Sequence, residues 1–162
     1  EASSGIDSAD VLRPSAISNS GSELISAVLA KSKVVDNGQS GILIDCRLEL
    51  TNNTGGAVRV KSIFHSPFDS FELIVTDPAN RLLTQLPYSF HQSPYSFEGR
   101  EFPITEGLNA ATLRFPIRRD VADAFPETIR VRIVGTLPGS GYVRILSTNT
   151  LDVTVNETKT AN

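Results

Sequence analysis

The stretch GILIDCRLELT, residues 41–51, decides the fold class of this chain. Apolar and polar side chains alternate along it with a period of two, and Leu43 is the one residue that breaks the alternation. One side carries the apolar set Ile42, Ile44, Cys46, Leu48 and Leu50. The other side carries Asp45, Arg47 and Glu49. Because an extended chain places alternate side chains on opposite faces, this pattern predicts a strand with one face in a core and one in water.

The same alternation recurs along the chain, between segments whose composition is typical of turns. It predicts further strands at residues 58–64, 71–76, 81–85, 112–117, 128–135, 142–146 and 150–155. Residues 23–35 fit either an amphipathic helix or a first strand, and the β-branched pair Val34 and Val35 favours the strand. One helical turn is expected over residues 120–125, with Asp120 as its cap and Pro126 as its stop.

Seven to nine short strands with one helical turn predict an all-β fold, namely an immunoglobulin-like antiparallel β-sandwich. With 162 residues, the chain has the length of one domain. We expect a flexible, Ser-rich N-terminal tether at residues 1–21, the β-sandwich domain at residues 22–157 and a C-terminal tail at residues 158–162.

Bulk composition excludes several classes of function. The formal net charge is −3, which argues against a general attraction to nucleic acid. No apolar run approaches the roughly 18 residues of a transmembrane helix. The chain starts at Glu1 and contains no methionine, so we expect a processed product, either after signal removal or after other trimming. With the tether, this favours a secreted, periplasmic or cell-envelope protein, and a cytoplasmic location stays open.

The residue types that carry catalysis or bind metals are sparse. His65 and His91 are the two histidines, and neither has a metal-ligand spacing to Cys46, the single cysteine. Cys46 lies on the apolar side of its strand and is expected to be a small buried residue. The sequence contains neither a Gly-x-Ser-x-Gly elbow nor a phosphate-binding glycine loop. We therefore predict no enzymatic activity, no catalytic residues, no metal and no cofactor.

The stretch Leu86–Pro103 is unusual, because the phrase Pro-Tyr-Ser-Phe occurs in it twice, at residues 87–90 and 94–97. It holds five of the eleven Phe and Tyr residues and three prolines, which predicts a long loop rather than a strand. Aromatic residues in loops are typical of recognition surfaces, so we predict contact with a protein partner or ligand. The alternative is that the aromatic rings turn inward and plug one end of the sandwich. The candidate binding residues are Tyr88, Phe90, His91, Tyr95, Phe97, Arg100 and Phe102.

Arginines form a second candidate surface on the polar sides of three predicted strands. These are Arg114, Arg130, Arg132 and Arg144, with Arg118 and Arg119 following the first of them. If the strands were neighbours, one sheet would carry a basic stripe suited to an acidic partner. The alternative is a solvated face on which nearby carboxylates balance the arginines.

Two phrases resemble known families. Residues 48–53 followed by 55–58 resemble the strand–Asn–turn–strand phrase of bacterial immunoglobulin-like domains. Residues 71–77, and 104–107 before 111–115, are similar to BsuPI-type intracellular proteinase inhibitors, although the turn at 77–80 lacks that family's usual glycine. The resemblance covers residues 42–118. It implies an immunoglobulin-like fold and adds one alternative to a binding module, a proteinase inhibitor that presents an extended loop. A third alternative, independent of the resemblance, is a structural spacer in a cell-surface or envelope assembly.

Overall fold

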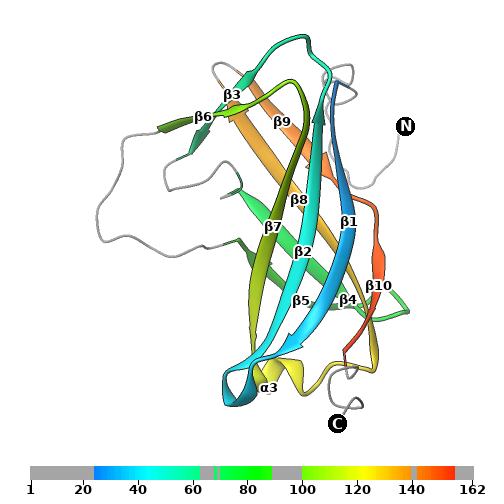
Figure 1. Cartoon of the computed structure of the whole chain (residues 1–162). Helices are drawn as coiled ribbons and strands as arrows, with labels where there is room; N and C mark the ends of the chain where they lie inside the picture. Colours follow the sequence, from blue (N-terminus) through cyan, green and yellow to red (C-terminus); the bar gives the residue numbers. More distant parts are fainter. Residues whose placement is uncertain (1–23, 63–67, 69, 89–99, 140–141, 156–162) are drawn as a thin grey trace.

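The computed structural model of the chain describes residues 24–62, 68, 70–88, 100–139 and 142–155 (Figure 1). The predicted tether and tail lie outside these residues. The described elements are, in order, β1 Ile25–Asp36, a 3-10 turn Gly38–Ser40, β2 Gly41–Asn52, β3 Val58–Ser62, β4 Phe71–Thr76, β5 Leu82–Pro87, β6 Arg100–Ile104, β7 Gly107–Arg118, α3 Arg119–Ala122, β8 Thr128–Gly139, β9 Tyr142–Ser147 and β10 Leu151–Thr154.

The described strands pair antiparallel in three sheets, so the chain is a mostly β protein as predicted. One sheet has the order β1-β2-β7, a second has the order β10-β8-β4-β5 with β9 also paired to β8, and β3 pairs with β6. In Figure 1 the first sheet lies in front of β4, β5 and β8. Inward side chains of all three sheets join in one hydrophobic core.

Strand β2 confirms the alternation that decided the fold class. Its five predicted apolar side chains are at most 4 % exposed, and β2 is the central strand of its sheet, paired with β1 and β7 along its length. Cys46 is fully buried, as expected, and burial raises the pKa of its thiol to about 11. It therefore packs as a small apolar side chain and is held in the unreactive protonated form at neutral pH.

The ambiguous segment is a strand from Ile25 onward, because β1 follows β2 in register from Ile25 to Asp36 with one bulge after Leu29. The strand count differs from the prediction: ten strands are described, against seven to nine expected. The strand that was not predicted is β6, which lies inside the stretch expected to be a loop.

Helix α3 is shorter than predicted, and its cap is a different residue. The N-cap is Arg118, which makes no side-chain capping bond, and the helix ends at Ala122, well before Pro126. Asp120 lies in the first turn instead, where its two oxygens accept hydrogen bonds from Nε and Nη2 of Arg118 at 3.1 and 2.8 Å. The carboxylate of Asp120 is thus engaged by a guanidinium and does not cap the helix.

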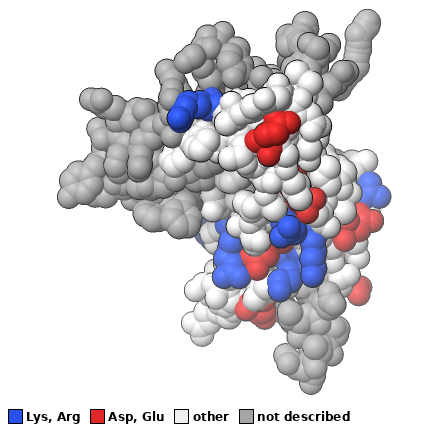
Figure 2. All heavy atoms as spheres, turned by 45° about the horizontal axis from the view of Figure 1, so that its top comes forward, with Lys and Arg blue, Asp and Glu red and all other residues white. Residues whose placement is uncertain are grey.

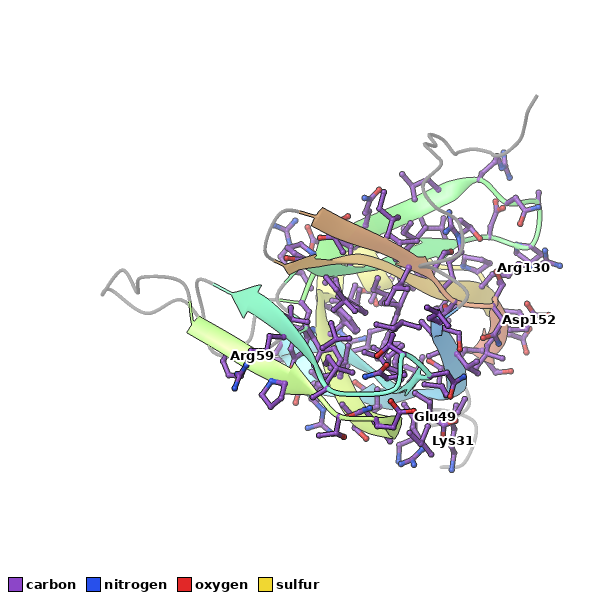
Figure 3. The ribbon with its side chains drawn as sticks, turned by 90° about the horizontal axis from the view of Figure 1, so that it is seen from above. Lys31, Glu49, Arg59, Arg130 and Asp152 are labelled. Carbon is purple, nitrogen blue, oxygen red and sulfur yellow. The ribbon has the colours of Figure 1, made fainter. Side chains whose placement is uncertain are left out.

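The four arginines do not form one stripe, because Arg114 lies on β7 of the first sheet. Arg130 and Arg132 lie on β8 of the second sheet, and Arg144 lies on β9 beside it, opposite the buried Leu137. Arg114 binds both oxygens of Asp45 at 2.7 and 2.8 Å, and Nε of Arg130 lies 3.3 Å from Oδ1 of Asp152 (Figure 3). On the face seen in Figure 2, basic and acidic side chains lie beside one another. These pairs support the alternative of balanced charges.

The pair between Asp45 and Arg114 predicts acid sensitivity. The hydrogen bonds from Arg114 lower the pKa of Asp45 below its usual 3.8, although burial opposes that shift. A lowered folded-state pKa contributes stability that is present above the unfolded-state pKa and is lost as the pH falls through the folded-state value. We expect the free energy of unfolding to decrease as the pH drops below about 4. The variant Asp45→Asn should show a smaller decrease, measured by urea titration at a series of pH values.

The control for this prediction is Asp120→Asn. The pKa of Asp120 is also lowered, by Arg118, but both side chains of that pair are exposed to solvent, which screens their interaction. We expect Asp120→Asn to leave the acid limb of the stability profile almost unchanged. Identical profiles for wild type and Asp45→Asn would contradict the assignment.

Candidate interaction site

The two ends of the aromatic stretch are strands. Strand β5 continues through Leu86 and Pro87, which pair with Leu73 and Glu72 of β4. Strand β6 starts at Arg100, and its Pro103 pairs with Arg59 of β3. The prediction that the prolines exclude strands here is therefore wrong. A proline is tolerated in a strand that has a neighbour on one side, because its missing N–H can face away from the ladder.

Tyr88 fixes the chain where it leaves β5. Its backbone N–H donates a hydrogen bond of 2.8 Å to the carbonyl oxygen of Phe71, which is almost fully buried. Its ring packs edge-on to Phe115 of β7, with 5.7 Å between centroids and 66° between planes. Tyr88 is half-buried against the core, so this residue follows the alternative in which an aromatic ring turns inward.

Phe102 fixes the returning end of the stretch. It pairs with Val60 of β3, and the next pair on the same face joins Val58 to Ile104. Val58, Val60 and Ile104 are buried, and Phe102 itself is half-buried. Phe102 thus lies on the core-facing side of the β3–β6 pair, while Figure 3 shows Arg59, on the opposite face, directed away from the body of the protein.

The remaining candidates are placed only in part. Arg100 opens β6 opposite Ser62, and its side chain lies outside the described residues. Phe90, His91, Tyr95 and Phe97 lie outside them entirely. The structure therefore packs Tyr88 on the core and holds Phe102, half-buried, beside Val60 of β3, so both serve as anchors on either side of residues 89–99.

Two asparagines that the sequence analysis did not single out hold loops to strands. Asn52 is fully buried, and its Nδ2 donates to the carbonyls of Gly56 and Ile104 at 3.0 and 2.9 Å. Its Oδ1 accepts from the backbone N–H and the hydroxyl of Thr54 at 3.0 and 2.7 Å. An Asn beside a glycine turn is common, but Asn52 also continues the period-two series from Ile42 to Leu50 on the buried side of β2. This position in the alternation was the signal that could have indicated its burial.

Asn149, in the connection between β9 and β10, acts in a similar way on the edge of β1. Its Nδ2 donates to the carbonyl of Leu29 at 3.1 Å, and its Oδ1 accepts from the N–H of Leu29 at 2.9 Å. The side-chain amide thus pairs with the backbone of Leu29 as a neighbouring strand would. This contact links the first sheet to the second.

These features define an antiparallel β protein with a hydrophobic core and side-chain amides that fix its connections. The sequence matches no protein-family model, and no curated protein is significantly similar to it. Within the described ranges, no three His, Cys, Asp or Glu side chains come together as metal ligands would. In the same part of the chain, every helix is too short or too polar to cross a bilayer.

Proposed function

We propose that this chain is an exported, non-catalytic binding module with an immunoglobulin-like β-sandwich fold. It contacts a protein partner with the aromatic segment, defined here as residues 89–99 between the anchors Tyr88 and Phe102. The observation that carries this proposal is the fixation of both ends of the segment: Tyr88 packs on the core, and Phe102 pairs with Val60 of β3.

Fixed ends favour recognition for a physical reason. Ordering a segment on binding costs conformational entropy, and anchors at both ends reduce the number of states that must be given up. Aromatic side chains then supply a large contact area with few rotatable bonds. The segment contains Phe90, Tyr95 and Phe97 together with His91. This combination is suited to a protein surface that offers apolar pockets and hydrogen-bond acceptors.

The sandwich assignment has its own support. The sheets β1-β2-β7 and β10-β8-β4-β5 contribute to a single core, and their connections include short turns such as residues 77–80. In that turn the N–H of Asn80 donates to the carbonyl of Asp77 at 2.8 Å, and Asn80 has a φ of 68°. Two such sheets around one core are typical of immunoglobulin-like domains.

The test separates binding from folding. The double variant Tyr95→Ala/Phe97→Ala is immobilised beside wild type and incubated with cell-envelope extract of the source organism, and retained proteins are quantified by mass spectrometry. We expect one protein, retained by wild type, to fall at least about tenfold on the double variant, which corresponds to about 1.4 kcal/mol. The melting temperature should change by no more than about 2 °C.

Tyr88→Ala is the matched control, because it removes an aromatic ring that packs on Phe115. We expect it to lower the melting temperature by several degrees, since a half-buried ring is worth about 1–3 kcal/mol. Unchanged retention on the double variant would overturn the proposal. A large loss of melting temperature in that variant would also do so, since it would mean that the segment is part of the core.

The alternative function is proteinase inhibition, and it rests on the resemblance of residues 71–77, 104–107 and 111–115 to BsuPI-type inhibitors. A segment held at both ends also suits an inhibitor that presents it to an active-site cleft. Equimolar protein added to a panel of purified serine and cysteine proteinases distinguishes the two functions. A binding module should slow none of them, whereas an inhibitor should slow one and keep its own segment uncleaved.

A further inference from the structure

Strand β7 has an edge that no other described strand covers. Its twelve residues pair with β2 from Gly107 to Arg118, and no other partner strand is recorded for it among the described residues. Its first seven residues, 107–113, read GLNAATL and contain neither a charged residue nor a proline. An uncharged edge of this length presents backbone groups that can pair with a further strand.

The other described edges carry features that oppose pairing. Strands β3 and β9 contain charged residues, Arg59 with Lys61 and Arg144 respectively. On β1, the side chain of Asn149 occupies the N–H and the carbonyl of Leu29 beside a bulge. Strand β5 ends in Pro87, β6 contains Pro103, and β10 has only four residues. Natural β proteins use such short strands, bulges and prolines to block edges. The first half of β7 lacks these features.

Side chains along this half of β7 are also less covered than those of the second half. Leu108 is 60 % exposed on the outer face, where Ala110 and Thr112 follow it. On the inner face, Asn109 and Ala111 are half-buried, whereas Leu113 and Phe115 are buried. A further strand along residues 108–112 would therefore cover apolar surface as well as backbone groups.

We propose that this edge binds the same edge of a second copy of the chain. The two β7 strands pair antiparallel about a twofold axis at Ala110 and join two three-stranded sheets into one of six strands. In this register Leu108 lies opposite Thr112, and Asn109 lies opposite Ala111. Small residues at the centre allow the two backbones to approach without a steric clash.

Charge complementarity favours a second copy as the occupant. In the register centred on Ala110, Arg114 of each copy comes to the end of the ladder where Glu106 of the other copy lies. The two opposite charges thus meet twice, once at each end, as a twofold interface requires. The side chain of Arg114 is 59 % exposed while its Nε and Nη2 bind Asp45 of β2, and Glu106 is exposed while its Oε1 accepts from the N–H of Gly55. Nη1 of Arg114 and Oε2 of Glu106 take part in neither contact, so each charge can meet a second partner.

A ladder of about five residues with limited side-chain contact gives a weak, reversible dimer. Sedimentation velocity on the full chain measures it. We expect the chain to be monomeric at about 1 µM and increasingly dimeric toward about 500 µM. This corresponds to a dissociation constant of the dimer in the micromolar to submillimolar range.

Ala110→Lys and Ala110→Glu are the decisive variants, because the axis places two identical charges directly opposite each other. Each variant alone should stay monomeric at every concentration, and an equimolar mixture should dimerise at least as well as wild type. The matched controls are Val28→Lys and Val28→Glu. Val28 pairs with Glu49, and Glu49 pairs with Ala110, so the three residues lie side by side on one face of the sheet (Figure 3 labels Glu49). Val28 belongs to β1, which is the opposite edge strand of this sheet. The controls should dimerise like wild type.

Three results would overturn the proposal. Wild type could remain monomeric throughout the concentration range, in which case the edge has another occupant, such as an extended partner peptide. Both Ala110 variants could dimerise like wild type, which would place the interface elsewhere. The mixture of the two variants could also remain monomeric, which would exclude a twofold axis at Ala110. Unchanged melting temperatures of the variants establish that they are folded.

Discussion

Replacing Asn52 with alanine is expected to lower the free energy of unfolding by about 3 kcal/mol. The amide of Asn52 is fully buried and makes four hydrogen bonds, two as donor and two as acceptor. Alanine would leave the carbonyl of Ile104 and the N–H of Thr54 without these partners, and a buried polar group without a partner costs its full desolvation energy. Urea titration with intrinsic fluorescence or circular dichroism measures the loss.

Asn52→Asp sharpens this prediction, because it changes only the donor end of the side chain. An aspartate oxygen would face the carbonyl oxygens of Gly56 and Ile104, which now accept from Nδ2 at 3.0 and 2.9 Å. At pH 7 we expect at least the destabilisation caused by alanine. Asn53→Ala is the control: Asn53 is exposed, and alanine keeps the backbone bond from its N–H to the carbonyl of Leu24. A cost below about 1 kcal/mol for both Asn52 variants would contradict the argument.

Gly41→Ala is expected to destabilise the protein by about 4 kcal/mol or to prevent folding. Gly41 has a φ of 126°, which side chains of L residues rarely allow. A Cβ at this position would also overlap the carbonyl oxygen of Ile117 and lie 2.8 Å from the backbone nitrogen of Arg119. Because both obstacles are backbone atoms, a rotamer change cannot relieve the clash.

The control for Gly41 is Gly56→Ala. No atom lies within 4 Å of a Cβ built on Gly56, and its φ is not in the left-handed region. We expect this variant to be neutral or to stabilise the protein by up to about 1 kcal/mol, because alanine restricts the unfolded chain. Circular dichroism during thermal unfolding compares the two glycine variants directly. Equal melting temperatures would show that the β2–β7 junction adapts more than its geometry indicates.

The sequence predicted those strands whose burial alternates along an unbroken run. In β2 and in β4, every second residue is buried, so hydrophobic periodicity alone indicated both. Strand β6 was missed because its five residues carry two charges and a proline, and its pairing with β3 depends on long-range contacts. The cap of α3 was assigned to the wrong residue because a nearby arginine engages the carboxylate of Asp120, and no local pattern encodes that competition.

The candidate site was predicted by composition and corrected by packing. A repeated aromatic phrase identified the stretch, but only the fold shows that Tyr88 reaches Phe115, which is 27 residues away along the chain. The predicted arginine stripe failed for the same reason, since sequence spacing does not say which strands are neighbours in a sheet. Asn149 was missed because its partner, Leu29, lies 120 residues earlier.

The bonds that Asn149 makes have a consequence for how this position tolerates mutation. Its side chain must donate through nitrogen and accept through oxygen at a fixed spacing from one residue of β1. Of the twenty standard side chains, only those of asparagine and glutamine present both groups on one planar unit, and glutamine is longer by a methylene. Position 149 is exposed to water, yet we expect it to accept as few other residues as a buried position does.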